Sequence, residues 1–283
     1  MLIVTTLADI EKYGEEMYRL ALDKSWSSYP TYADGIKNKW DFYAAAKRLV
    51  QNATSELLLY VRNEKVEGWI GYFWLTEDKY LELEFCITRG MAHGALSELS
   101  ERIGSRFPDY NVYFGFPSDN SDAVNYLKDN GFEIIEESYN YSFFFENYSE
   151  TSDDSHVKKI LRDNFNDFRS VYKPGDKTYW TPDRILAQLE KWTAFTYSEQ
   201  VPLGAIFVHN GVHSEIFGLE IATDTNCDEI CSALIRAVLN SCKRSNVKFL
   251  TFLCDDAVRK VAEDCGFNFV SKCLCLYKNI RPI

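Results

Sequence analysis

The chain has 283 residues, of which 46% are hydrophobic and 15% aromatic, and its formal net charge is −11. The apolar content excludes a largely disordered chain, and the length favours two folded domains over one. The negative charge disfavours nucleic acid and anionic membranes as partners because it repels phosphate groups, although such charge also simply keeps a protein dissolved.

No run in the sequence approaches the roughly 20 apolar residues that a membrane-spanning helix needs. The first residues, MLIVTTLADIEKYGEE, lack the basic stretch, apolar segment and cleavage site of a secretion signal, so we expect a cytoplasmic protein. The eight cysteines lie mostly in apolar segments, which is typical of reduced, buried thiols. Cys227 and Cys231 form an i, i+4 pair, but there is no paired Cys-x-x-Cys spacing, so we expect no metal.

The first half of the sequence predicts a helical region followed by alternating strands and helices. Residues 9–24 and 41–50 have helical character, and residues 56–74 form two β-rich runs around the polar turn NEKVEG. In residues 79–87 one expected strand face carries Leu81, Leu83, Phe85 and Ile87, and the other carries Tyr80, Glu82, Glu84 and Cys86. There follow a helix over 91–107, a strand over 111–116, a helix over 121–132 and β-rich runs over 133–137 and 139–145.

The second half repeats this order. Helical regions over 156–172 and 182–192 precede a hairpin over 193–211, and then a strand, helix, strand, helix and closing strand follow over 214–222, 227–242, 247–254, 257–267 and 269–277. A repeat of this size indicates a duplicated domain. We therefore expect two α/β domains with mixed sheets, residues 1–147 and 148–283, joined by the polar stretch NYSETSDDS.

A strand that enters a glycine-containing loop and then a helix directs free backbone N–H groups at a ligand over the helix start, which suits an anion. Here residues 85–87 are followed by Arg89, Gly90 and Gly94. The charge of Arg89 and the small glycines fit a phosphate group, although such a turn is more often a plain connection.

At these residues the sequence resembles the GNAT superfamily of N-acetyltransferases. The run from Arg89 to Gly94 is similar to the family's pyrophosphate loop Q/R-x-x-G-x-G/A, with Ala92 in place of the first glycine. The segment from Asn120 through Asn130-Gly131-Phe132 resembles the family's N-x-x-A segment that ends in G-F, and the hairpin VEGWIGYFWL resembles its central antiparallel ribbon. The element order of both halves is similar to that fold.

The resemblance implies an acyltransferase that moves an acetyl group from acetyl-CoA to a primary amine of a small molecule or a peptide. The loop would hold the pyrophosphate, the strand edge would pair with pantetheine, and the amide of the N-x-x-A segment would lie near the thiol arm. The cofactor-binding residues implied in this way are Phe85, Cys86, Ile87, Arg89, Gly90, Ala92, His93, Gly94, Ala95 and Asn120. The aromatic stretch over 26–42 either walls the acceptor cleft or packs the helices on the sheet.

Two residues are candidates for the proton transfers. Glu84 is expected to accept the proton of the attacking amine, with Glu82 as its neighbour on the same face and a solvated acidic face as the alternative. Tyr126 is the candidate acid for the leaving thiolate, but it lies one residue from the family's tyrosine position, Leu127, and a helix rotates about 100 degrees per residue. A core position for Tyr126 therefore stays open, and Cys86 as a nucleophile has no histidine placed beside it.

The second half lacks these features. Its loop reads Asn226-Cys227-Asp228-Glu229, and two acids at this position repel a pyrophosphate. We expect this half to be a degenerate copy that supports the first, walls the acceptor cleft or mediates assembly, and a homodimer stays open. The alternative reading of the whole chain is a degenerate CoA-binding or scaffold module, because a fold does not fix a function.

Overall fold

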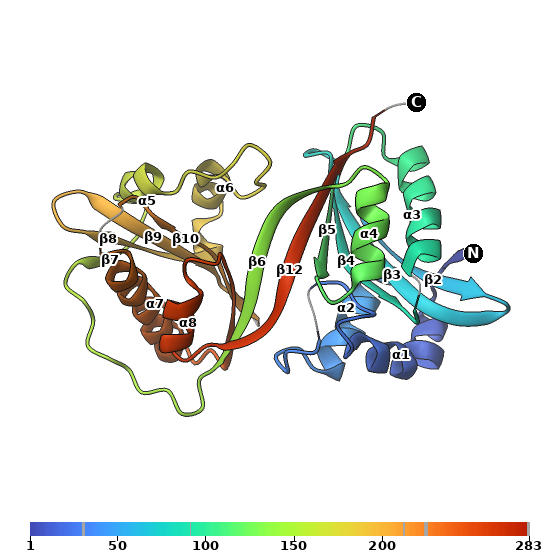
Figure 1. Cartoon of the computed structure of the whole chain (residues 1–283), viewed down its shortest axis with the longest axis horizontal. Coiled ribbons are helices and arrows are strands. Elements are labelled where there is room, and N and C mark those ends of the chain that lie inside the picture. The colour runs from blue at the N-terminus through green and yellow to red at the C-terminus, as the bar shows by residue number, and fades with distance from the viewer. Residues whose placement is uncertain (30–31, 91, 212, 224–225, 282–283) are drawn as a thin grey trace. The chain divides into compact units, whose positions relative to one another are not determined.

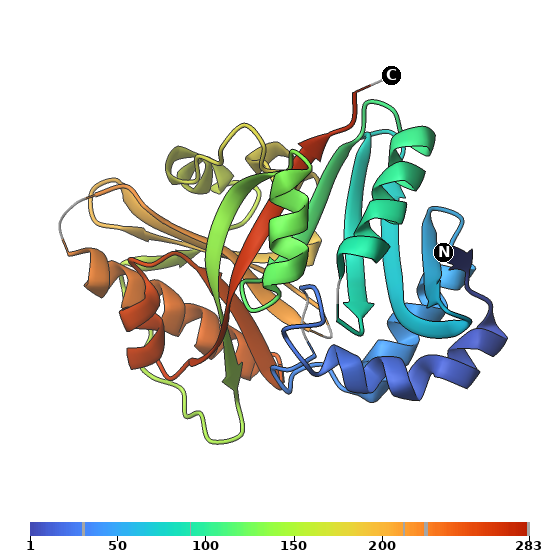
Figure 2. The same cartoon turned by 45° about the vertical axis from the view of Figure 1, so that its right-hand side comes forward.

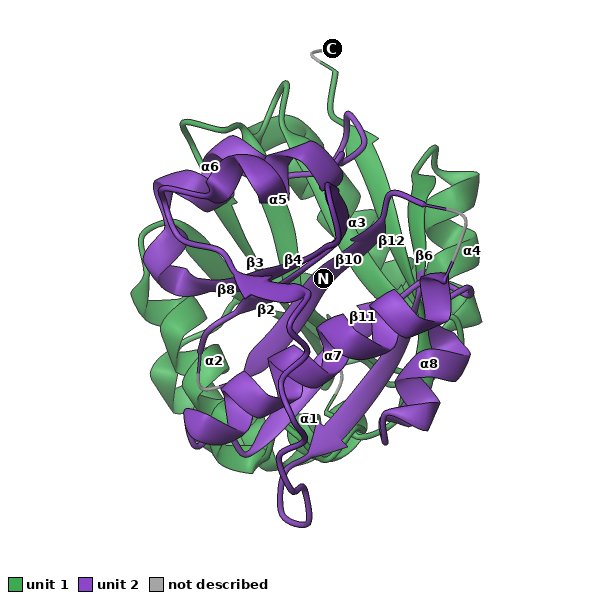
Figure 3. Cartoon of the chain, turned by 90° about the vertical axis from the view of Figure 1, so that its left-hand side faces the viewer, with its two compact units in different colours: residues 1–137, 271–283 green, residues 138–270 purple. Residues whose placement is uncertain are grey.

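The structure (Figure 1) is a computed structural model that describes residues 1–29, 32–90, 92–211, 213–223 and 226–281. The chain forms two compact units (Figure 3). Unit 1 contains residues 1–137 and 271–283, and unit 2 contains residues 138–270. In each of them helices cover a mixed β-sheet, so the predicted α/β fold with mixed sheets is confirmed.

The sheet of unit 1 has the strand order β1-β2-β3-β4-β5-β12. Neighbouring strands are antiparallel except for the parallel pair β4 and β5. The strands are β1 (Leu2–Val4), β2 (Ser55–Arg62), β3 (Lys65–Leu75), β4 (Tyr80–Thr88), β5 (Asn111–Pro117) and β12 (Asn268–Asn279).

Helices cover both faces of this sheet (Figure 2). One face carries α1 (Leu7–Ala21) and α2 (Lys39–Gln51), and the other carries α3 (Ala92–Arg106) and α4 (Ser121–Asp129). Side chains of β2 alternate between the two cores, because successive residues of a strand point to opposite faces. Both α1 and α2 begin with a capping box, formed by Thr6 with Asp9 and by Asn38 with Asp41, which satisfies amides at the helix start.

A β-bulge at Glu84 interrupts the alternation along β4. In the pairing with β3, Gly71 faces Phe85 and Tyr72 faces Leu83, so Glu84 is the extra residue. Phe85 consequently joins the core under α1 and α2, whereas Leu83 lies in the core under α3 and α4. The predicted single face with Leu81, Leu83, Phe85 and Ile87 is therefore wrong, because one extra residue reverses the facing of everything after it.

Unit 2 has the strand order β6-β11-β10-β9-β8-β7, in which only β10 and β11 are parallel. Its strands are β6 (Glu133–Phe144), β7 (Val157–Lys159), β8 (Trp192–Ser198), β9 (Pro202–His209), β10 (Ser214–Ile221) and β11 (Phe249–Cys254). Its helices are α5 (Phe165–Val171), α6 (Pro182–Ala187), the 3₁₀ turn η1 (Leu189–Lys191), α7 (Cys227–Arg244) and α8 (Arg259–Asp264). The predicted helix over 156–172 is thus wrong at its start, where β7 pairs with β8.

The strands that follow the last helix of each half are exchanged between the units. β6 follows α4 of unit 1 but pairs with β11 of unit 2, and β12 follows α8 of unit 2 but pairs with β5 of unit 1. The sequence alone predicts each closing strand in its own half and a division of the chain at residue 147. Pairing partners separated by more than 150 residues, such as Tyr113 and Tyr277, leave no local signal of such an exchange.

Candidate functional site

The parallel strands β4 and β5 separate shortly after they begin. They are paired only between Tyr80–Glu82 and Asn111–Tyr113. We call the space between the following residues, Leu83–Thr88 of β4 and Phe114–Pro117 of β5, slot 1. Diverging parallel strands expose main-chain groups that a further extended chain can bond.

In slot 1 this further chain is the protein's own segment Trp26–Tyr29. The N–H of Ser28 donates to the carbonyl of Cys86 at 2.9 Å, and the N–H of Cys86 donates to Oγ of Ser28 at 2.7 Å. The N–H of Thr88 donates to the carbonyl of Trp26 at 2.9 Å. The segment is thus an antiparallel neighbour of β4 along the edge that the sequence analysis assigned to pantetheine.

The other side of slot 1 bonds the same segment. The N–H of Tyr29 donates to the carbonyl of Gly115 in β5 at 2.9 Å, and Nδ2 of Asn120 donates to the carbonyl of Ser27 at 3.1 Å. Asn120 also caps α4 by accepting the N–H of Ala123. Consequently the predicted cofactor residues Phe85, Cys86 and Ile87 are each only 1% exposed.

The loop between β4 and α3 also carries its own partners. The guanidinium of Arg89 forms an ion pair with Glu16 of α1, and the N–H of His93 donates to Oδ2 of Asp122 at 3.2 Å. The side chains of Ala92 and Ala95 lie in the core, not over the helix start. A carboxylate therefore stands at an N-terminal amide of α3, where the resemblance places a phosphate.

Gly90 of this loop and Gly94 in the first turn of α3 are glycines for different structural reasons. Gly90 has a φ of +60°, which favours glycine, and a Cβ built on it would meet no heavy atom within 4 Å. A Cβ on Gly94 would lie 2.5 Å from the hydroxyl oxygen of Tyr60, so Gly94 allows α3 to approach β2 closely. Met91 of the motif lies outside the described residues.

The bulge residue Glu84 points to the α1 and α2 side of the sheet. Its Oε1 lies 2.5 Å from Nη2 of Arg48, and its side chain is 20% exposed. Burial, and then the charge of Glu84, raise the pKa of the nearby phenol of Tyr32. Glu82 instead accepts a hydrogen bond from the hydroxyl of Tyr80, so the two acids have different partners, and both are partly buried.

Neither Cys86 nor Tyr126 faces an open part of slot 1. Burial raises the pKa of the Cys86 thiol to about 12, so it stays protonated at neutral pH and is a poor nucleophile. Tyr126 is 8% exposed in the core of α3 and α4, with its ring centroid 4.7 Å from that of His93. Leu127 is fully buried in the same core.

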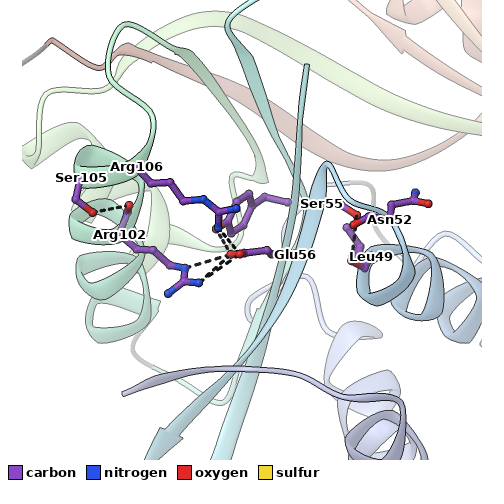
Figure 4. Close-up of polar contacts among 8 residues, drawn as sticks. Leu49, Asn52, Ser55, Glu56, Arg102, Ser105 and Arg106 are labelled. Atoms are coloured by element: carbon purple, nitrogen blue, oxygen red, sulfur yellow. Dashed lines mark hydrogen bonds and ion pairs between the residues drawn. The ribbon is translucent and has the colours of Figure 1, made fainter. Parts of the chain in front are cut away.

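A polar cluster fixes α3 to the sheet (Figure 4). Glu56 of β2 accepts hydrogen bonds from Arg102 and Arg106 of α3 and from the hydroxyl of Tyr72. Burial acts to raise the pKa of Glu56, but the bonds from Tyr72 and Arg106 outweigh it and hold the pKa below its usual value. The helix that follows the candidate loop is therefore held by an ionised carboxylate.

Unit 2 contains a second pair of diverging strands. β10 and β11 are paired only between Ser214–Ile216 and Leu250–Phe252, and β10 has its own bulge at Phe217. We call the space beyond, beside Phe217–Ile221 of β10, slot 2. The pairings Gly204–Ile221 and Ile206–Leu219 repeat those of Gly68–Thr88 and Ile70–Cys86, which makes Leu219 the counterpart of Cys86 and Ile221 that of Thr88.

The two slots differ in exposure. In slot 1 the last residues of β4 are buried beneath Trp26–Tyr29, and Thr88 is 2% exposed. In slot 2 Phe217 is 39% exposed, Glu220 is exposed, and Leu219 and Ile221 are partly exposed. Whereas the segment Trp26–Tyr29 covers the last residues of β4, the corresponding residues of β10 are exposed or partly exposed.

The role of Trp26–Tyr29 is not among the predictions from the sequence, in which the aromatic residues form a cleft wall or pack the helices. A signal was present: Tyr29 precedes Pro30, and a residue before proline favours an extended backbone. Two serines between aromatic residues also suit a strand better than a helix interior.

Further properties of the described residues bear on function. No group of three or more His, Cys, Asp or Glu side chains among them is placed to hold a metal ion. None of the helices built from them is long and apolar enough to cross a membrane. All eight cysteines are free thiols.

The sequence matches no protein-family model and no curated protein. Solved structures share its fold. A GCN5-related N-acetyltransferase from Sphaerobacter thermophilus is 13% identical with a TM-score of 0.66, over 100% of this chain and 96% of that one. A Drosophila protein is 10% identical with a TM-score of 0.60, and a tandem GNAT protein from the clavulanic acid biosynthesis pathway is 8% identical with a TM-score of 0.57. Each alignment covers 100% of this chain and 99% of the other. The chain therefore has the tandem GNAT fold that its sequence resembles.

Proposed function

We propose that the chain is an acyl-CoA-dependent N-acetyltransferase that transfers an acetyl group from acetyl-CoA to a primary amine of a small molecule or a peptide. The observation that carries this proposal is the divergence of β4 from β5 beyond Glu82 and Tyr113, beside the bulge at Glu84. Cys86 and Thr88 turn main-chain groups into slot 1 and bond an extended chain there. Pantetheine is an extended chain with amide groups, so it can take the same bonds.

Acetyl-CoA can enter slot 1 only when Trp26–Tyr29 leaves it. The structure around the loop is compatible with the remainder of the cofactor, because Gly90 has free space around its Cα. A diphosphate at the start of α3 would take the place of Asp122 as the acceptor for the N–H of His93, and the place of Glu16 as the partner of Arg89. Both carboxylates are exposed. Both carboxylates would have to turn away from the diphosphate, because like charges repel.

When bound, acetyl-CoA supplies the thioester that the amine attacks directly. Glu84 is the residue that we assign to accept the amine's proton, since its carboxylate is at the bulge and partly exposed. Main-chain N–H groups after the bulge would stabilise the developing oxyanion. The role of Tyr126 as the acid stays a prediction, and its position in the core of α3 and α4 makes packing the competing explanation.

A second candidate function is a binding module without turnover. The filled slot 1 favours it, because the segment Trp26–Tyr29 bonds both strands and Asn120 and leaves Cys86 and Thr88 buried. In this case the first unit would be a scaffold whose former ligand position holds part of its own chain.

One pair of measurements separates these functions. Thiol release from acetyl-CoA is followed with a panel of primary amines, and thermal stability is measured with and without acetyl-CoA. The proposed function requires amine-dependent thiol release. Stabilisation without thiol release would support the binding module, and the absence of both signals would contradict any role for acetyl-CoA.

A further inference from the structure

Slot 2 presents a strand edge that carries no neighbour within the described part of unit 2. The N–H of Ala222 donates to the carbonyl of Leu203 in β9, so the alternating residues Leu219 and Ile221 turn their N–H groups the other way. Leu219 and Ile221 correspond to Cys86 and Thr88 of slot 1, whose main-chain groups bond the segment Trp26–Tyr29 in unit 1. No described residue of unit 2 bonds the N–H groups of Leu219 and Ile221, so these groups can bond an added strand.

Slot 1 demonstrates which ligand this geometry accepts. Its occupant is a peptide, and both diverging strands bond it through main-chain groups at 2.9 Å. The same register, the same bulge and the same parallel pair recur around slot 2. An extended peptide thus fits slot 2 by the bonding that the chain itself uses in slot 1.

The chemistry at the end of slot 2 differs by one functional group. Asn120 accepts the N–H of Ala123 and donates to the carbonyl of Ser27 in slot 1. Asp255 accepts the N–H of Val258 in the same way before α8, but a carboxylate has no N–H to donate. Slot 2 thus has the carboxylate of Asp255 where slot 1 has the N–H donor of Asn120, and this negative charge favours a cationic group on the ligand.

Other acids extend this negative charge. Glu220 of β10 has a raised pKa because of burial and then the charge of Asp255, so the two carboxyl groups lie in each other's field. Asp228 and Glu229 form the first turn of α7, where a diphosphate would otherwise find free amides. The charge around slot 2 therefore disfavours a phosphate ligand and complements basic side chains.

We propose that slot 2 binds an extended segment of a partner protein that carries basic side chains and adds as a strand along Phe217–Ile221. Main-chain bonds to Leu219 and Ile221 supply the register, and Asp255 with Glu220 supplies the preference for lysine or arginine. This site is separate from slot 1 and does not depend on acetyl transfer.

The test uses the full chain and two fluorescent hexapeptides, KTVTVK and ETVTVE, which have the same strand propensity and opposite charge. Anisotropy is expected to show saturable binding of KTVTVK that weakens with salt, and much weaker binding of ETVTVE. Amide hydrogen exchange is expected to slow at Leu219 and Ile221 on addition of KTVTVK. Equal binding of both peptides, or no protection of these amides, would overturn the proposal.

Conservative substitutions test binding in variants that are expected to keep the fold. Asp255→Asn restores the amide found at Asn120 and is expected to weaken KTVTVK binding about two- to fivefold, as for the loss of one exposed charge pair. Asp264→Asn removes the same charge at the other end of α8 and is expected to leave binding unchanged. If both variants weaken binding equally, or if acetyl-CoA protects Leu219 and Ile221 instead, slot 2 is not a site for basic peptides.

Discussion

Ser28 and Cys86 are joined by two hydrogen bonds, one from the N–H of Ser28 to the carbonyl of Cys86 and one from the N–H of Cys86 to Oγ of Ser28. Both residues are buried, so these polar groups have no access to water. This pair fixes the segment Trp26–Tyr29 in slot 1 and makes the serine side chain part of the sheet.

The first prediction concerns this pair. Ser28→Ala removes the acceptor of the Cys86 N–H and leaves a buried donor unsatisfied, which costs about 1–3 kcal/mol. We expect a loss of this size in the free energy of unfolding, measured with a chemical denaturant. Ser25→Ala is the control, because Ser25 is an exposed serine three residues earlier. An unchanged stability of Ser28→Ala would contradict the structure of slot 1.

The second prediction concerns proton transfer at the bulge. If Glu84 accepts the amine's proton, Glu84→Gln lowers kcat about 100-fold or more, because general-base catalysis contributes roughly that factor. Glu82→Gln is the matched variant, since Glu82 lies two residues away on the same strand and bonds Tyr80. Steady-state kinetics should show a large loss for the first variant and a small one for the second. The reverse order would move the base to Glu82.

Much of the fold could be predicted from the sequence because it depends on local patterns. The strand over 79–87, the helix over 91–107 and the turn at Gly131 follow from periodicity and from the left-handed conformation that glycine accepts, with φ +78° at Gly131. The repeat of this order predicted two similar units for the same reason.

The candidate site was less predictable because it depends on contacts distant in sequence. The bulge at Glu84 reverses the facing of Phe85 without any change in composition. The partners of Arg89 and Cys86 come from α1 and from the segment after it, about 60 to 70 residues earlier. A motif identifies which residues could bind a ligand, but not which part of the chain already bonds them.

The third prediction concerns acid stability through Glu56. Its pKa is held below the ordinary value near 4.5, so its contribution to stability is present above that pH and is lost as the pH falls through the folded-state pKa. Denaturant unfolding should show that the wild type loses stability between pH 7 and pH 3, and that this loss is smaller in Glu56→Gln. At pH 7 this variant is expected to cost about 1–3 kcal/mol, since the arginine partners are partly exposed.

The control for Glu56 is Glu101→Gln on α3, which is exposed and changes the net charge by the same amount. Its unfolding curve should follow that of the wild type at every pH. If Glu101→Gln reduces the loss of stability at acid pH as much as Glu56→Gln does, the effect is due to net charge and not to the cluster with Tyr72 and Arg106.

The fourth prediction separates packing from cofactor binding at Gly94. Alanine normally stabilises a helix interior by roughly 1 kcal/mol relative to glycine. Here the new Cβ would lie 2.5 Å from the hydroxyl oxygen of Tyr60 but 3.5 Å from its Cζ atom, so the hydroxyl alone causes the clash. Gly94→Ala is therefore expected to destabilise the protein by about 1–3 kcal/mol, as overpacking does.

Combining Gly94→Ala with Tyr60→Phe tests this explanation, because Tyr60→Phe removes the oxygen and keeps the ring. The double variant should recover the stability lost in Gly94→Ala, and a double-mutant cycle by denaturant unfolding measures the coupling. Gly94 would then be explained by the close approach of α3 to β2. Additive effects of the two substitutions would show that Tyr60 does not restrict position 94. The glycine would then be attributed to the loop's approach to a ligand, since a Cβ there would hinder a phosphate at the start of α3.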